Sequence, residues 1–328
     1  MKKLIDRIIQ FWFLNIMYQN KTQLSFLIIG MIFILCPYYI QAQNEIRKTS
    51  IILNGTGNYE ITLADIVMEV DANCGARIIS FRLKNQEVLS SSGINQENYG
   101  STLWLSPQIW KWPPSPILDT KPYQCELNKN TLNLTSQPDS LSGCKISKNF
   151  VANSSDSSFS IKYLITNISK KDKSVAPWEV TRVPAGGISF FPIGTTGGFS
   201  KSNLNTEDKN GICWFRYEPE LVTGHQKLFR NGHEGWLAHV NNGLVFIKQF
   251  PDIGIESEAP NETEIELYTN KDRTYIELEN QGPYQTLHQR ESISWTVKWY
   301  LRELPPTVGI AVGSESLANF VRKIITKK

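Results

Sequence analysis

The sequence lacks a strong net charge. It holds 34 Lys and Arg residues against 31 Asp and Glu residues, which gives a formal net charge of +3. The first 43 residues contain four basic residues and one acidic residue, so the rest of the chain is close to neutral. A neutral chain has no electrostatic footprint for a phosphate backbone, and nucleic acid is therefore not expected as a partner.

The sequence also lacks the motifs of several enzyme classes. It contains no glycine loop that cradles phosphate, no nucleophile elbow and no dinucleotide fingerprint. His233 and Glu234 open a zinc-helix pattern, but the position that needs the second histidine is Leu237. We therefore expect neither a metal nor another cofactor.

Cysteine is scarce, and its spacing matches no zinc pattern. Four cysteines follow residue 43, namely Cys74, Cys125, Cys144 and Cys213. Cys125 and Cys144 lie on segments expected to form neighbouring strands, which makes them the best candidates for a disulfide. The alternative is that all four are small buried hydrophobic residues.

One long apolar run stands near the N-terminus. Residues 24–40 carry no charge and are followed by Ala42. The run predicts a signal peptide over residues 1–43 with cleavage near Ala42, and Met17 is an alternative start. The protein is then exported to the periplasm or the outer cell surface. In the rival interpretation the leader is an uncleaved anchor, the chain's only contact with a membrane. Residues 44–328 are expected to form a single domain.

Strand patterns dominate the rest of the chain. Runs rich in β-branched and aromatic residues, several alternating with polar ones, predict strands at 78–83, 131–135, 159–165, 187–191, 264–269, 274–279 and 292–301. Asn242-Gly243 predicts a type I′ hairpin, and residues 270–273 predict a second hairpin. Only the tail predicts a helix, with Ser314 as its N-cap. The pattern indicates an all-β fold, a large antiparallel β-sandwich with a short C-terminal helix.

A tryptophan- and proline-rich segment, residues 100–116, is the first candidate for ligand binding. Trp104, Trp110 and Trp112 lie among prolines that exclude a regular central strand, with Gln108 between them. Exposed indole faces pack against the C–H groups of sugars, and Trp110 is the tryptophan most expected to be exposed. The alternative is a tryptophan-rich plug over one end of the core.

Charged residues interrupt two further segments. In residues 176–187, Glu179 and Arg182 are three positions apart on an expected strand, so they should point to opposite faces. They either belong to structural ion pairs or bind a ligand. Residues 224–240 hold three of the four histidines, and His225 and His233 are the candidates for catalysis there. A lone histidine is more often a surface residue than a catalyst.

Three segments carry a resemblance to a known superfamily. Residues 73–89, NCGARIISFRLKNQEVL, resemble the opening hairpin of aldose 1-epimerases, and residues 163–178 resemble the strand that leads to their catalytic histidine. Residues 276–284, IELENQGPY, resemble the segment in which Glu279 falls on the catalytic glutamate. The chain is thus similar to the galactose mutarotase-like superfamily. Its closer likeness, which includes the Trp-Pro segment and APWEVTRVP, is to an uncharacterised exported bacterial family near the mutarotases.

The resemblance implies an exported carbohydrate-active protein, first of all an aldose epimerase-like isomerase that works by general acid/base catalysis on a mono- or oligosaccharide. Glu279 is the implied base. The family's Asn-His pair is absent, so the acid is expected from Glu179, His225 or His233. The expected substrate contacts are Trp110, Gln108, Trp104, Trp178, Arg182, Lys227 and Arg230. A non-catalytic carbohydrate-binding protein and an envelope assembly component are the alternatives.

Overall fold

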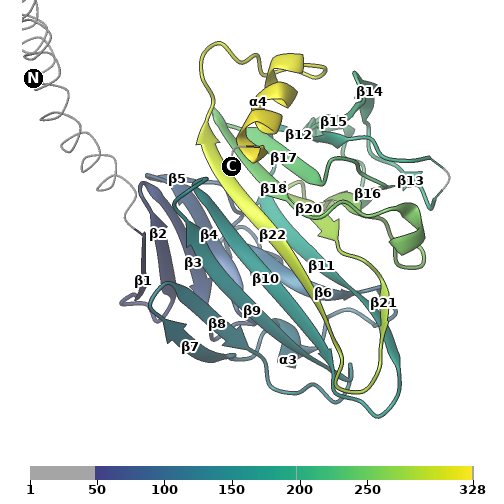
Figure 1. The fold of residues 1–328 in the computed structure, drawn as a ribbon. Coiled ribbons are helices and arrows are strands. Elements are labelled where there is room, and N and C mark those ends of the chain that lie inside the picture. The colour runs from purple at the N-terminus through teal and green to yellow at the C-terminus, as the bar shows by residue number, and fades with distance from the viewer. Residues whose placement is uncertain (1–48, 197, 327–328) are drawn as a thin grey trace, which may run out of the picture. The chain divides into compact units, whose positions relative to one another are not determined.

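The structure is a computed structural model, and it describes residues 49–196 and 198–326. In these residues two antiparallel sheets pack face to face (Figure 1). The larger sheet has twelve strands. In spatial order ten of them are β1 (Thr49–Leu53), β2 (Tyr59–Leu63), β3 (Ile66–Asp71), β4 (Arg77–Leu83), β6 (Ser101–Ser106), β11 (Lys173–Pro184), β20 (Tyr275–Gln281), β19 (Ile265–Thr269), β16 (Gln226–Arg230) and β13 (Lys201–Ser202). Beside this row, β5 (Gln86–Glu87) pairs with β4 and β21 (Gln285–Leu287) pairs with β11.

The second sheet has ten strands and lies against the first. Its order is β14 (Glu207–Lys209), β15 (Ile212–Arg216), β12 (Ile188–Pro192), β17 (Trp236–Asn241), β18 (Leu244–Gln249), β22 (Ser292–Glu303), β10 (Ser158–Asn167), β9 (Cys144–Asn153), β8 (Thr131–Thr135) and β7 (Gln124–Asn128). Every predicted strand is present, and the predicted all-β sandwich is confirmed.

Side-chain alternation builds the core between the sheets. On β9, alternate residues from Cys144 to Phe150 are buried, as the period of a strand requires. Phe81 of the twelve-stranded sheet meets Phe246 and Trp299 of the ten-stranded sheet, with ring centroids 5.6 and 5.3 Å away. Edge-on aromatic contacts of this kind add to the area that the two sheets bury against each other.

The predicted turns and tail helix are confirmed. Asn242 (φ 48°) and Gly243 (φ 77°) both have the positive φ of a type I′ turn and join β17 to β18. Residues 270–273 join β19 to β20. Helix α4 (Glu315–Ile325) begins after Ser314, whose hydroxyl accepts a hydrogen bond from the Leu317 N–H at 3.2 Å.

Helix α4 covers the outer face of the ten-stranded sheet. Its apolar side packs in one buried cluster with Trp214, Trp236 and Tyr300 (Figure 1). The outer face of the twelve-stranded sheet instead carries a small separate cluster, in which Trp104 and Trp178 are the aromatic members. Several buried charged residues, described below, also lie on this outer face of the twelve-stranded sheet.

The structure adds short helical segments that the sequence did not predict, namely α3 (Pro116–Asp119), η1 (Pro219–Leu221) and η2 (Ile255–Ser257). It also corrects the proposed disulfide. Cys125 on β7 and Cys144 on β9 are separated by β8, and both are free thiols, as are Cys74 and Cys213.

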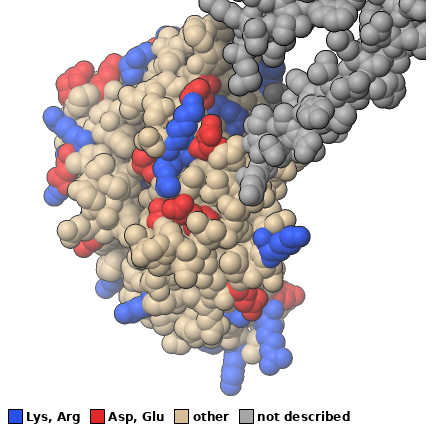
Figure 2. Space-filling view, turned by 90° about the vertical axis from the view of Figure 1, so that its left-hand side faces the viewer, with Lys and Arg blue, Asp and Glu red and all other residues tan. Residues whose placement is uncertain are grey.

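The surface charge of the described residues shows no large patch of one sign in the view of Figure 2. Basic and acidic side chains are intermixed on the visible part of the face shown in Figure 2. No helix within residues 49–196 and 198–326 is long and apolar enough to cross a membrane. The predicted leader and its cleavage site lie outside the described residues.

Candidate functional site

Strand β11 divides its side chains between two environments. Trp178 and Val180 belong to the small cluster on the outer face of the sheet, whereas the intervening Glu179 points into the space between the sheets. Arg182 lies on the same outer face as Trp178, with its guanidinium 5.0 Å from the centre of the Trp104 ring. The prediction that Glu179 and Arg182 point to opposite faces is confirmed.

Glu179 is part of a structural network inside the sandwich. Its carboxylate accepts hydrogen bonds from the Tyr163 hydroxyl and from Trp299 Nε1 at 3.1 Å. It also pairs with Lys248 at 3.0 Å, and both side chains are fully buried. Burial lowers the pKa of Lys248, and Glu179 opposes that change. The structure therefore separates Glu179 from any ligand on the outer face.

Five charged residues meet on the outer face of four adjacent strands. They are Lys227 on β16, Glu266 on β19, Glu277 and Glu279 on β20, and Arg182 on β11. The register places Glu266 opposite Glu279, and Glu277 opposite Arg182. We call this group the charged face. Its members are far apart in sequence, and only the strand order β16-β19-β20-β11 brings them together.

Lys227 links two of the carboxylates. Its Nζ lies 2.6 Å from Glu266 and 3.0 Å from Glu279. Trp178 Nε1 donates a second hydrogen bond to Glu279 at 2.8 Å. Glu279 therefore accepts two hydrogen bonds, both at its Oε2 atom.

Arg182 holds the remaining carboxylate. Its Nε donates to Glu277 Oε1 at 2.8 Å. The other side of the face is aromatic, since the Trp104 and Trp178 rings are 5.3 Å apart and Trp110 lies 5.7 Å from Trp104. The charged face is thus bordered by indole rings.

Burial and crowding shift the protonation of these carboxyl groups. Burial raises the pKa of Glu266 well above its usual range, and Lys227 only partly opposes this. Burial likewise raises the pKa of Glu277 to about 7. The positive charge of Arg182 lowers this pKa, and the neighbouring Glu279 raises it further. For Lys227, burial lowers the pKa, but Glu266 and Glu279 outweigh burial and the net shift is upward. Carboxyl groups of different proton affinity therefore lie side by side.

Several hydrogen-bonding atoms of the outer face remain unused. Arg182 Nη1 and Nη2, Glu279 Oε1 and Gln281 Oε1 are buried and have no hydrogen-bond partner among the residues that the structure describes. An unpaired buried polar group costs about 1–3 kcal/mol, and such groups are uncommon in folded proteins. Two unused donors and two unused acceptors on one face are the pattern expected of a binding site for a polar ligand.

The charged face reaches solvent at one side. About a quarter of the Lys227 side chain is exposed (24%), whereas Glu279 and Arg182 have no exposed surface. Tyr268 lies near this opening, where its hydroxyl and His225 Nδ1 are hydrogen-bonded and the two rings stack 5.8 Å apart. His225 is therefore at the rim of the site.

Other predicted site residues lie elsewhere. His233 is exposed and lies 3.7 Å from Asp252. Arg230 forms a bidentate pair with Asp208 at 2.7 Å, and Gln108 is exposed, with its backbone N–H donating to Glu262 at 3.0 Å. Of the predicted residues, the structure brings together Glu279, Arg182, Lys227, Trp178, Trp104 and Trp110.

Glu266 and Glu277 were missed by the sequence analysis. A signal was present, because Glu264 and Glu266 alternate with apolar residues on one predicted strand, and Glu277 and Glu279 do so on the next. Alternation puts the glutamates of each strand on one face, and the hairpin register, which pairs Glu266 with Glu279, puts both sets on the same face.

The fold and the family were compared with known proteins. The model of a family described as "Domain of unknown function (DUF4380)" matches residues 106–302, more than half of the chain. No curated protein matches the chain.

Solved structures match the fold at low sequence identity. A galactose mutarotase-like protein from Lactobacillus casei is 9% identical, with a TM-score of 0.54, over 78% of this chain and 100% of that one. A galactose mutarotase related enzyme from Lactobacillus acidophilus is 8% identical, with a TM-score of 0.54, over 76% and 98%. A TPR-domain containing protein from Parabacteroides distasonis is 16% identical, with a TM-score of 0.57, over 77% of this chain and about half (48%) of that one. The chain shares its fold with these galactose mutarotase-like proteins.

Proposed function

We propose that this chain, which belongs to the DUF4380 family, binds an aldose at its charged face and interconverts the two anomers of that sugar. The observation that carries the proposal is the set of unused buried atoms, namely two donors of Arg182 and one acceptor each of Glu279 and Gln281. Sugar hydroxyls both donate and accept hydrogen bonds, so one sugar can satisfy both kinds of atom. The neighbouring indole rings suit its C–H surface.

The proposed reaction transfers two protons. Glu279 takes the proton of the anomeric hydroxyl at its unused Oε1, while Glu277 protonates the ring oxygen. The bond between C1 and the ring oxygen breaks and leaves an open-chain aldehyde. After rotation about the C1–C2 bond, the hydroxyl that was the ring oxygen attacks the other side of the C1 carbonyl. Its proton returns to Glu277, and Glu279 returns its proton to the new anomeric hydroxyl. Because its pKa is about 7, Glu277 is partly protonated at neutral pH, as a general acid requires.

The positions of the two carboxyl groups suit this division of roles. They are two residues apart on β20, which places their α-carbons roughly 7 Å apart on the same face. Since Glu279 and Arg182 have no exposed surface, a sugar reaches them only after side chains move, and Lys227, which contacts Glu279 and is partly exposed, is the candidate.

Polarimetry of a freshly dissolved pure anomer tests the enzymatic proposal. Glu279→Gln keeps the shape of the side chain but removes the base, so the catalysed rate should fall by about 10² to 10⁴. Glu207→Gln, at an exposed glutamate on β14, is the matched control and should keep the wild-type rate. A wild-type rate equal to that of buffer for all common aldoses would show that the protein is not a mutarotase.

Binding without turnover is the second candidate. The observation that favours it is the complete burial of Glu279 beneath contacts with Lys227 and Trp178, because a base that is already hydrogen-bonded twice is less available to a substrate. Calorimetry separates the two candidates. Heat of binding for a sugar without any polarimetric rate supports the binding protein, and the Glu279→Gln variant should then lose affinity as well.

We also propose that the protein acts outside the cytoplasm, in the periplasm or at the outer cell surface. The support is the uncharged run at residues 24–40, followed by Ala42. An exported sugar-binding protein meets its ligand before uptake into the cell.

A further inference from the structure

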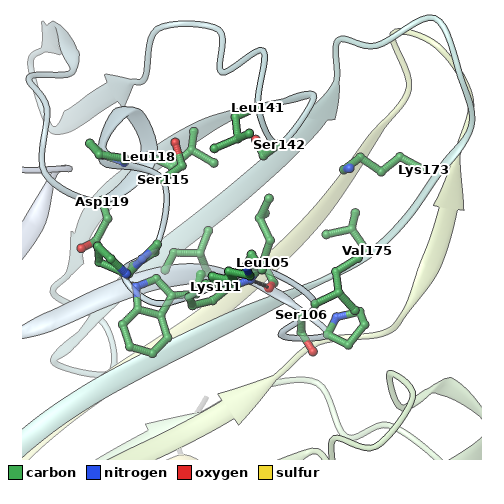
Figure 3. Close-up of a pocket in the computed structure, with 18 of the residues that line it drawn as sticks. Leu105, Ser106, Lys111, Ser115, Leu118, Asp119, Leu141, Ser142, Lys173 and Val175 are labelled. Atoms are coloured by element: carbon green, nitrogen blue, oxygen red, sulfur yellow. Dashed lines mark hydrogen bonds between the residues drawn. The ribbon is translucent and has the colours of Figure 1, made fainter.

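A cavity of about 500 Å³ lies beneath the Trp-Pro segment, at the end of the sandwich. Its walls come from β6, the segment that follows β6, helix α3, the start of β11 and the turn at Leu141 and Ser142 (Figure 3). Of the charged face and its indole border, only Trp104 and Trp110 line it. The cavity therefore adjoins the charged face without including any of its charged residues, and its size is in the range that holds a small organic ligand.

The walls of this cavity are mainly apolar. Leu105, Leu118 and Val175 contribute aliphatic side chains, and Ile109 and several prolines extend the same surface. Trp110 lines it as well, with its Nε1 already donating to the Leu105 carbonyl at 2.9 Å. A ligand body that fills this space must be apolar, because most of the wall offers it neither a donor nor an acceptor.

The charged groups of the cavity are two lysines and one aspartate, and four serines add neutral polar groups, namely Ser106, Ser115, Ser142 and Ser174. Lys111 and Lys173 both line it, and neither forms an ion pair with a carboxylate in the part of the chain that the structure describes. Figure 3 shows the ammonium group of Lys173 directed across the cavity towards Leu141 and Ser142. An ammonium without a carboxylate partner attracts an anion, and Lys173, which is partly buried, is screened less by water than the exposed Lys111.

The one acidic residue that lines the cavity is already neutralised. Asp119 pairs with Arg77 at 3.0 Å and accepts hydrogen bonds from Thr102 Oγ1 at 2.6 Å and Trp104 Nε1 at 3.0 Å. Its carboxylate is thus saturated with donors and does not compete for Lys173.

We infer that this cavity binds a small organic acid with an apolar body. The carboxylate of the ligand lies at Lys173, and its aryl or alkyl body packs on Leu105, Val175 and Trp110. The inference does not rest on the sugar proposal, because it uses none of the charged residues of that site and shares only the indole border with it. It remains testable if no sugar binds.

Calorimetry with a matched pair of probes tests the inference on the intact protein. The acid is 4-phenylbutyrate, and its neutral counterpart is 4-phenylbutan-1-ol. The wild type should bind the acid about tenfold or more tightly than the alcohol, as a charge-assisted hydrogen bond predicts. Lys173→Met should weaken binding of the acid to the level of the alcohol and leave the alcohol unchanged.

Two further variants make the result specific. Lys173→Arg keeps the charge and should retain selectivity for the acid, and Lys170→Met, at an exposed lysine outside the cavity, should bind both probes like the wild type. Thermal unfolding checks that each variant is folded. Equal affinity for acid and alcohol, an unchanged affinity in Lys173→Met, or no binding of the acid to the wild type would each overturn the inference.

Discussion

At the scale of single residues, buried carboxyl groups are the feature most sensitive to solution conditions. Burial raises the pKa of Glu264 to about 8 from its ordinary 4.5, although the N–H groups of Ile253 and Gly232 that donate to it act in the opposite direction. The folded state then binds this proton more tightly than the unfolded state. The stability that the proton confers is present at low pH and is lost as pH rises from about 4.5 to about 8.

Glu264→Gln tests this at one residue, because glutamine resembles the protonated acid. Between about pH 5 and pH 8 the wild type should lose roughly 3 kcal/mol more unfolding free energy than the variant. Urea denaturation at both pH values measures the difference. Using the variant as reference cancels other titrating groups, such as His239, whose pKa burial lowers to about 4. Parallel pH profiles for the two proteins would show that Glu264 does not titrate in this range.

The tryptophans of the outer face should divide into binding and structural residues. Trp178 is fully buried, and Trp178→Ala should cost about 3–5 kcal/mol of stability. Trp110 is only half-buried, so Trp110→Ala should cost clearly less while weakening sugar binding about tenfold. Denaturation and calorimetry on both variants measure the two effects. Equal losses of stability would place Trp110 in the core instead.

At the scale of elements, the geometry of the β17–β18 turn predicts how much stability a glycine substitution costs. Gly243 has a φ of 77° in the β17–β18 hairpin, and an added Cβ would meet no atom within 4 Å. Gly243→Ala should therefore cost about 1 kcal/mol through backbone strain alone. Gly55 is equally open but has no positive φ, so Gly55→Ala is the control and should be neutral or slightly stabilising. A neutral Gly243→Ala in denaturation experiments would contradict the type I′ turn.

The elements themselves were largely predictable, because alternation and turn residues act locally. The run at 292–301, for instance, appears as β22, Ser292–Glu303. The pairing of strands was less predictable than their existence. Cys125 and Cys144 were expected on neighbouring strands, but β8 (Thr131–Thr135), itself a predicted strand, lies between theirs.

The candidate site was predictable only in part, for a related reason. The alternation of side chains along β11 correctly predicted that Glu179 and Arg182 point to opposite faces, because this alternation depends on one strand alone. The partners of these residues depend on strand order and sheet packing. The sequence therefore gave no sign that Glu179 meets Lys248 across the core, or that Lys227 meets Glu266 on the outer face.

At the scale of the whole molecule, the resemblance to galactose mutarotase-like proteins predicted the fold, because the order of several weak motifs reflects the order of the strands. Function does not follow from fold alone.

Export is a separate prediction, and it concerns residues 1–43. Expression in a bacterial host followed by mass spectrometry should find a mature N-terminus near Gln43 or Asn44 if the signal peptide is cleaved near Ala42. Recovery of the intact leader in the membrane fraction would support the anchor instead.

The most direct test of the central claim is a crystal structure of the protein soaked in saturating D-galactose or D-glucose. We expect a sugar on the outer face of the twelve-stranded sheet, with hydroxyl groups within hydrogen-bond distance of Arg182 Nη1 or Nη2 and of Glu279 Oε1. A sugar bound only elsewhere on the molecule, or a charged face left without sugar in both soaks, would contradict it.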